Sequence, residues 1–214
     1  MSSSGTGRLV TVTDQLSLLN DETEPAPPEG LIYVDDFVSE AEEAELLHLL
    51  DVDHVDDWLP DLLRRVQHYG YKYDYRQRRV DRTMELGPLP DSLRSIADRI
   101  AVETSMSTPF DQAIVNEYEP GQGIAEHIDC EPCFGDMVAT LSLGSDIEMQ
   151  FGHRPTGGQH HQRLRRRSLA ILSGPARYEW THSIAKRKSD RWGGPRVPRE
   201  RRVSITFRTV LLSS

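Results

Sequence analysis

Histidine and aspartate side chains, which bind transition metals in proteins, occur here at a spacing that could place them on one ion. His127 and Asp129 are separated by a single residue, and His182 follows much later in the chain. Residues two apart in an extended segment point the same way, so the first two can reach one ion together, while His182 must arrive on another strand. Two imidazoles and one carboxylate favour Fe(II) with open coordination positions over a closed structural zinc. A His-x-Asp pair alone is more typical of a surface turn, so the interpretation also depends on the residues described next.

Two arginines near the C-terminus could hold an anion beside such an ion. A polar series alternates with an apolar one in this stretch, namely Arg202, Ser204, Thr206 and Arg208 against Val203, Ile205 and Phe207. A strand therefore presents both arginines on one face. Buried arginines without anionic partners would be strongly unfavourable, and a dicarboxylate such as 2-oxoglutarate would resolve this. The alternative is an edge strand with exposed arginines, which the β-branched and aromatic opposite face disfavours.

Asn116 and Tyr118 share a face of another expected strand, just before the turn at Pro120 and Gly121. Their amide and phenol groups can hydrogen-bond a carboxylate or a keto oxygen. Taken by themselves they are equally typical of polar residues at a strand end.

Hydrophobic periodicity predicts a mainly β chain of the α+β class. After residue 110 the period is two, and we expect strands at residues 113–118, 137–143, 147–151, 168–173 and 202–212, with an earlier one at 31–34. Ser39 and Glu42 form a capping box that begins a helix ending near residue 50, and Pro90 begins a second helix. Short strands separated by turns indicate a sandwich or jelly roll, with the N-terminal helices packed on one sheet.

Charge is distributed unevenly along the 214 residues. The formal net charge is −9, but residues 1–60 contain fifteen acidic residues and one basic residue, while the rest carries a net charge of +5. Residues 1–30 are Ser/Gly-rich, then acidic and Pro-rich, so we expect a disordered tail before a single domain at residues 31–214.

Membrane spans, secretory signals and disulfide frameworks are not indicated. No apolar run approaches the ~18–20 residues of a span, and the N-terminus lacks the layout of a secretory signal. We therefore expect a cytoplasmic protein, or a nuclear one in a eukaryote. Cys130 and Cys133 form a single C-x-x-C pair, too few ligands for a structural zinc, and we interpret the pair as reduced and incidental.

The chemistry-bearing motifs resemble those of the AlkB family of Fe(II)/2-oxoglutarate dioxygenases. The resemblance extends from about residue 31 to residue 212 and is carried by Asn116-x-Tyr118, His127-x-Asp129, His182 and Arg202-x5-Arg208. The second arginine distinguishes this family from related oxygenases. Many members have Asn where this chain has Ser204, and there the chain is similar to the tRNA-modifying branch.

The resemblance implies a double-stranded β-helix with Fe(II) at His127, Asp129 and His182, together with 2-oxoglutarate and O2. It further implies that Arg202 and Tyr118 hold the distal carboxylate of 2-oxoglutarate, that Arg208 and Asn116 hold its keto-acid end, and that Ser204 belongs to the same pocket. It also implies a nucleotide-recognition lid, which we assign to about residues 61–90, where tyrosines and arginines are interleaved. Such rings can stack on an unpaired base while arginines meet phosphates.

Candidate substrate-binding residues in or near the lid are Tyr71, Tyr73, Tyr75, Arg76 and, beside the metal pair, Glu131. The alternative for the lid is a solvated loop with core tyrosines. Two further basic segments, residues 163–167 and 186–201, could contact phosphates or form ordinary charged loops.

The expected function is an oxidoreductase that demethylates or hydroxylates an alkylated or modified base of RNA, tRNA or DNA, in repair or in RNA modification. Such an enzyme requires a single-stranded or flipped base. We expect a monomer. Two alternatives remain, namely the same chemistry on a protein side chain or small molecule, and a non-catalytic jelly-roll module that binds a metal or ligand.

Overall fold

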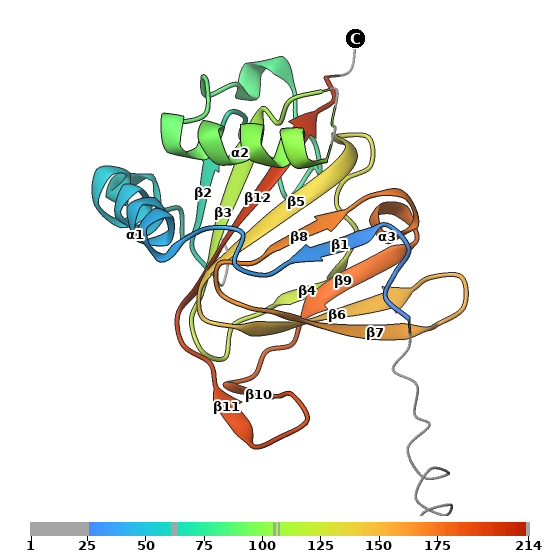
Figure 1. Cartoon of the computed structure of the whole chain (residues 1–214). Helices are drawn as coiled ribbons and strands as arrows, with labels where there is room; N and C mark the ends of the chain where they lie inside the picture. Colours follow the sequence, from blue (N-terminus) through green and yellow to red (C-terminus); the bar gives the residue numbers. More distant parts are fainter. Residues whose placement is uncertain (1–25, 61–63, 105, 107, 213–214) are drawn as a thin grey trace, which may run out of the picture.

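Two antiparallel sheets face each other in the computed structural model, which describes residues 26–60, 64–104, 106 and 108–212 (Figure 1). The six-stranded sheet has the order β1-β8-β5-β12-β3-β2, and the four-stranded sheet has the order β4-β9-β6-β7. In the first sheet the strands are β1 (Leu31–Val34), β2 (Val66–Tyr69), β3 (Gln112–Tyr118), β5 (Phe134–Gly144), β8 (Leu169–Leu172) and β12 (Arg202–Val210). In the second they are β4 (Ile124–His127), β6 (Ile147–His153), β7 (Gln159–Leu164) and β9 (Trp180–Ile184). This arrangement confirms the predicted mainly β jelly roll.

A separate hairpin of β10 (Ser189–Arg191) and β11 (Arg196–Pro198) lies between β9 and β12 in the chain. The helices are α1 (Glu40–His48), α2 (Asp91–Glu103) and the short α3 (Gly174–Tyr178). Among the described residues, no helix is both long and apolar enough to cross a membrane.

β12 occupies the middle of the six-stranded sheet, between β5 and β3. Its apolar series, Val203, Ile205 and Phe207, is fully buried in the main core together with α1 and α2 residues. The polar series therefore faces the other sheet, as the period of two requires. The alternative of an edge strand with exposed arginines is wrong, because Arg202 is only 1% exposed.

The two predicted helices both cover the outer face of the six-stranded sheet (Figure 1). At the start of α1 the Ser39 side chain accepts from the Glu42 backbone N–H, and the Glu42 side chain accepts from the Ser39 backbone N–H. This confirms the capping box, and the helix then passes into a π-helical turn at Leu49–Asp53. On α2 the buried residues recur at helical spacing and pack against β12; they are Leu93, Ile96, Ala97 and Ile100.

Several strands of the structure were not expected from the sequence. β2 lies inside the segment assigned to the lid, yet it pairs with β3 and forms an edge of the large sheet. β7 contains His160 and His161 and pairs with β6. Both β4 and β7 are short and largely half-exposed, so they lack the clean apolar alternation that revealed β6 and β12.

The expectation that Cys130 and Cys133 are reduced is wrong for this structure, because their sulfur atoms are joined in a disulfide. Both cysteines are buried, and both sulfur atoms lie within 3.3 Å of the Arg78 carbonyl oxygen. The disulfide packs with Tyr71, Tyr73 and Phe134 in a small core of its own.

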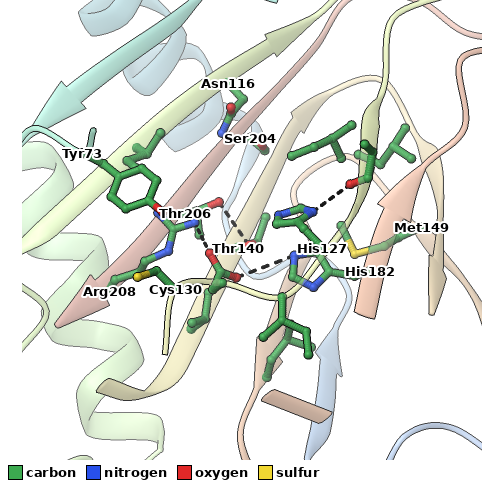
Figure 2. Close-up of a pocket in the computed structure, with 18 of the residues that line it drawn as sticks. Tyr73, Asn116, His127, Cys130, Thr140, Met149, His182, Ser204, Thr206 and Arg208 are labelled. Atoms are coloured by element: carbon green, nitrogen blue, oxygen red, sulfur yellow. Dashed lines mark hydrogen bonds and ion pairs between the residues drawn. The ribbon is translucent and has the colours of Figure 1, made fainter. Parts of the chain in front are cut away.

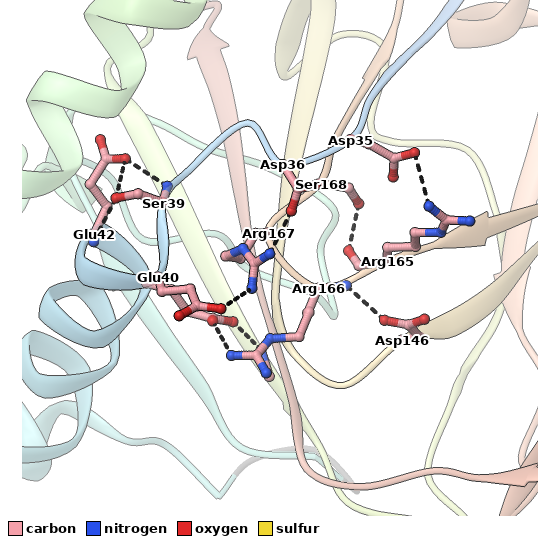
Figure 3. Close-up of polar contacts among 12 residues, drawn as sticks. Asp35, Asp36, Ser39, Glu40, Glu42, Asp146, Arg165, Arg166, Arg167 and Ser168 are labelled. Atoms are coloured by element: carbon pink, nitrogen blue, oxygen red, sulfur yellow. Dashed lines mark hydrogen bonds and ion pairs between the residues drawn. The ribbon is translucent and has the colours of Figure 1, made fainter.

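Acidic side chains neutralise the arginine cluster at residues 163–167, and Figure 3 shows the contacts of Arg165, Arg166 and Arg167. Arg166 binds Glu43, Arg167 binds Asp36 and Glu40, Arg165 binds Asp35, and Arg163 binds Asp146. Four of these five carboxylates belong to the acidic N-terminal segment. The cluster thus fastens that segment to the β7–β8 connection, and the idea that it contacts phosphates is not supported.

Candidate active site

A cavity of about 390 Å³ lies between the two sheets. Its wall includes the four polar residues of β12, the polar face of β3, and all three predicted metal ligands. Figure 2 shows His127 and His182 side by side at one side of the cavity, with Arg208 and Thr206 reaching in from β12. Side chains widely separated in the sequence therefore meet in one space.

The three predicted metal ligands converge. His127 on β4 is paired in register with His182 on β9, and their ring centroids are 4.3 Å apart. His182 Nε2 lies 3.6 Å from Asp129 Oδ2. The Nδ1 atom of His127 donates to the carbonyl oxygen of Ala125 at 2.9 Å, so Nε2 is the ring nitrogen that remains for a metal.

Asp129 is ionised and already bound to a cation. Its side chain is 6% exposed, and Arg208 Nη2 donates to its Oδ1 at 2.5 Å. Burial by itself would raise the pKa of this carboxyl, but Arg208 and, after it, His182 and His127 outweigh burial and hold that pKa well below its usual range. The carboxylate is therefore negatively charged at every physiological pH.

His182 is neutral for the opposite reason. Burial lowers its pKa to about 3, with a further lowering from the adjacent His127 ring. A neutral imidazole is the form that binds a metal. The Nδ1 atom of His182 is buried and has no hydrogen-bond partner within the described part of the chain.

This donor set fits Fe(II) in type, and Asp129 and His182 are in the protonation states that bind a metal. It is not preformed as a chelate, since no group of three or more His, Cys, Asp or Glu side chains among the described residues has metal-holding geometry. In this structure the Asp129 carboxylate faces the Arg208 guanidinium instead of an ion.

Arg202 is a buried cation with too few partners. One of its nitrogens, Nη2, donates to Ser142 Oγ at 2.8 Å, while Nε and Nη1 are buried and have no partner among the residues that the structure describes. Burial lowers its pKa to about 10, so it is still charged near neutral pH. Nε and Nη1 of Arg208 are likewise buried, with no partner in the described part of the chain. Buried guanidinium donors are almost always satisfied, so an anion with several oxygens fits this end of the cavity.

The other predicted co-substrate residues line the same end. In register with β12, Tyr118 stands opposite Arg202 and Asn116 stands opposite Ser204. The Tyr118 ring centroid is 5.4 Å from the Arg202 guanidinium carbon. Arg64 belongs to the segment predicted to form the lid and was not predicted to contact Asn116. Its Nε donates to Asn116 Oδ1 at 2.8 Å, and its side chain also lines the cavity.

Of the five candidate substrate residues, only Tyr73 and Tyr75 line the cavity. Their rings meet edge to face at 5.0 Å, and burial raises the pKa of Tyr75 to about 12, so its hydroxyl stays protonated. Tyr71 packs against the disulfide, and Arg76 is exposed and does not line the cavity. Glu131 lines a separate hollow and does not line this cavity, so its contact with a substrate stays a prediction.

Arg177 is a second residue that the sequence did not reveal. It is 2% exposed and donates to the main-chain carbonyls of Asp129, Cys130 and Gly135 at 3.0–3.4 Å. It thus holds the loop that carries Asp129. No sequence pattern marks an arginine whose partners are main-chain atoms.

The sequence pattern of the 2OG-Fe(II) oxygenase superfamily matches residues 30–208. Among curated proteins, the chain is 41% identical over 168 residues to the tRNA (carboxymethyluridine(34)-5-O)-methyltransferase alkbh8 of Xenopus tropicalis. That match covers 78% of this chain and 27% of the relative. It is 37% identical over 204 residues to the Alkylated DNA repair protein ALKBH8 homolog of Arabidopsis thaliana, covering 85% of this chain and 58% of that protein. The chain thus spans about a quarter to about three fifths of these relatives.

Among solved structures, the chain resembles OsALKBH1 with a TM-score of 0.66 and 17% sequence identity. The likeness covers 86% of this chain and 98% of the other. At 17% identity this likeness supports the jelly-roll fold alone.

Proposed function

The chain belongs to the 2OG-Fe(II) oxygenase superfamily, and we propose that it oxidises an alkylated or otherwise modified base within a nucleic acid. The observation that carries the proposal is a single cavity that joins a His/Asp/His set to buried, unpaired arginine donors and to a wall of tyrosines. The relatives named for tRNA and for alkylated DNA support a nucleic-acid substrate.

In this proposal His127, Asp129 and His182 hold Fe(II). Arg202 and Tyr118 bind the distal carboxylate of 2-oxoglutarate, with Ser204 beside them, while Arg208 and Asn116 bind the keto-acid end. When bound, the iron and 2-oxoglutarate supply oxidation of a C–H bond by O2, with release of succinate and CO2.

The protein's own groups position the reactants and exclude water. The paired rings of Tyr73 and Tyr75 offer an aromatic surface for a base that has left its stack. Because 2-oxoglutarate brings two carboxylates into a cavity with four unpaired guanidinium nitrogens, its binding also relieves the charge of Arg202 and Arg208. We further propose one oxygenase domain from residue 31 to residue 214, with a substrate lid confined to the part of residues 61–90 that follows β2.

Two measurements test the proposal. Anaerobic titration with Fe(II) and 2-oxoglutarate should produce a weak visible charge-transfer band, which should be lost in Asp129→Ala. Succinate release should then be stimulated by methylated oligonucleotides or total tRNA, with matching nucleoside changes in mass spectrometry.

Each alternative predicts a different result. No visible band would indicate a non-catalytic binding module. A band with succinate release stimulated only by a protein or a metabolite would place the same chemistry on another substrate.

A further inference from the structure

The connection from β9 to β12, residues 185–201, is strongly basic, and we call it the arm. It contains seven basic and two acidic residues, in a protein whose net charge is −9. Figure 1 shows its β10–β11 hairpin extending beyond the two sheets. The arm therefore concentrates positive charge on a projecting element.

Three arginines of the arm are occupied in fixing it to the body. Arg199 donates twice to Asp190, at 2.6 and 2.8 Å, and this carboxylate is 1% exposed. Arg187 joins Asp190 to Glu148 on β6, with both contacts at 2.6 Å. Arg201 binds Glu117 and Asp51. These charges are consumed by internal ion pairs, so they hold the arm in place and cannot serve a partner.

The other four basic residues have no such role. Lys186, Lys188, Arg191 and Arg196 are exposed, and none has a hydrogen bond or ion pair from its side chain to any residue that the structure describes. The contrast with residues 163–167 is informative, because each of the four arginines in that cluster is paired with a carboxylate.

Two of these cations stand directly opposite each other. In the β10–β11 ladder Arg191 is paired in register with Arg196. Like charges at facing positions destabilise a two-stranded ladder unless an anion lies between or beside them. The hairpin thus has an arrangement that an anionic partner would improve.

The arm begins and ends at the active-site cavity. Ile184 lines the cavity on the β9 side and Arg202 lines it on the β12 side. Lys186 is two residues from Ile184, so their Cα atoms are within about 7 Å. Lys188 lies beside Gly121, in the turn that leads to the strand of His127. A polyanion on the arm would therefore pass close to the cavity.

We infer that the arm binds the sugar–phosphate backbone of the nucleic acid whose base enters the cavity. This inference rests on the proposed function and deepens it by naming the surface that the polymer contacts. Four cations spread over eleven residues suit successive phosphates better than a single small anion. Phosphate contacts position a chain without reading its sequence, so the arm should act on any sequence.

The test is the salt dependence of binding to a labelled 20-nucleotide single-stranded RNA and to the DNA of the same sequence. The variant carries Lys186→Gln, Lys188→Gln, Arg191→Gln and Arg196→Gln together. Each phosphate contact on a single strand contributes ~0.7 to the steepness of log K against log salt. If each cation contacts one phosphate, the fourfold variant should therefore have a slope that is about 3 less steep, and its binding in low salt should be at least tenfold weaker.

Two single substitutions, one inside the arm and one outside it, serve as the control. Arg191→Gln should lower the slope by about 0.7, whereas Arg154→Gln, on the β6–β7 turn, should leave it unchanged. Arg154 is also exposed and has no side-chain partner within the described residues. All variants should keep the visible band with Fe(II) and 2-oxoglutarate, which shows that they are folded.

The outcomes separate the two proposals. If the wild type binds and oxidises the polymer but the fourfold variant has the same slope and affinity, the arm inference is wrong and the proposed function stands. If the wild type binds anionic lipid vesicles and neither polymer, both are wrong.

Discussion

Replacing Arg202 with methionine should make the ligand-free protein more stable while abolishing its response to 2-oxoglutarate. Methionine keeps most of the apolar stem of arginine and removes the charge. The change therefore separates what Arg202 does for the fold from what it does for a ligand. For most buried residues the two effects have the same sign, and here we expect opposite signs.

The magnitude follows from the burial of the guanidinium. Burial lowers its pKa from 12.5 to about 10. A shift of that size corresponds to about 3 kcal/mol of unfavourable free energy for the charged form. At pH 7 both the folded and the unfolded forms are protonated, so the full penalty applies, and it is relieved only as the pH rises above the folded pKa. Losing the bond to Ser142 Oγ offsets about 1 kcal/mol, so we expect a net gain of about 1–3 kcal/mol.

Arg199 provides the matched control. It is buried to a similar degree, but it is paired with Asp190, whose side chain is fully buried. Arg199→Met breaks that pair and leaves a buried carboxylate with Arg187 alone, so it should destabilise the protein by about 3–5 kcal/mol. Two buried arginines three residues apart thus differ in sign because one has a carboxylate and the other does not.

The assay is urea unfolding of the metal-loaded protein, kept anaerobic, with and without 2-oxoglutarate. At a ligand concentration of 100 times its Kd the wild type should gain about 2.7 kcal/mol, and Arg202→Met should gain nothing. A variant that is less stable than the wild type without ligand would refute the reasoning, because Arg202 would then be a net structural contributor. An undiminished gain with ligand would refute its assignment to the co-substrate.

Three further predictions concern other parts of the molecule. The free energy of unfolding of the metal-free protein should fall by about 2 kcal/mol between pH 7 and pH 5, because the unfolded His182 imidazole binds a proton below pH 6.5, whereas the folded one has a pKa of about 3. In urea unfolding, His182→Gln should show a smaller fall over this pH range, and the same fall in both proteins would contradict the prediction. Arg177→Met should weaken Fe(II) binding by about 10- to 100-fold, with partial rescue by Arg177→Lys, because the Asp129 loop loses its donors; equal metal affinity in the folded variant would exclude a positioning role. Ser39→Ala should cost about 1 kcal/mol by removing the cap of α1, and an unchanged urea midpoint would show that the cap contributes little.

Strand β12 and helix α2 were predictable because the alternation of polar and apolar residues in each shows which face is buried in the core. From Arg202 to Arg208, β12 alternates polar and apolar residues, and α2 repeats its apolar residues at helical spacing. The convergence of His127, Asp129 and His182 was predictable for a related reason. A His-x-Asp spacing can place both side chains on one face of an extended segment, and only His182 required the fold to complete the set.

The features that were missed depend on contacts that local sequence does not encode. Arg64 and Arg177 owe their places to an amide and to main-chain carbonyls far along the chain. The arginines of residues 163–167 were as promising for phosphates as those of the arm, because charge in a sequence does not reveal which carboxylates folding brings near. Glu131 is close to Asp129 in the chain, yet the loop directs it toward a different hollow.

The central position of β12 ties folding fidelity to chemistry. Its two neighbours fix which residues look inward, and slipping the strand by one position would exchange the two series, burying guanidinium groups among the helices and turning Phe207 toward the cavity. Errors of register in this strand are consequently penalised twice over, once by the energetics of the core and once by loss of the pocket. A deletion or insertion of a single amino acid there should be harder for the protein to tolerate than almost any substitution at the same sites.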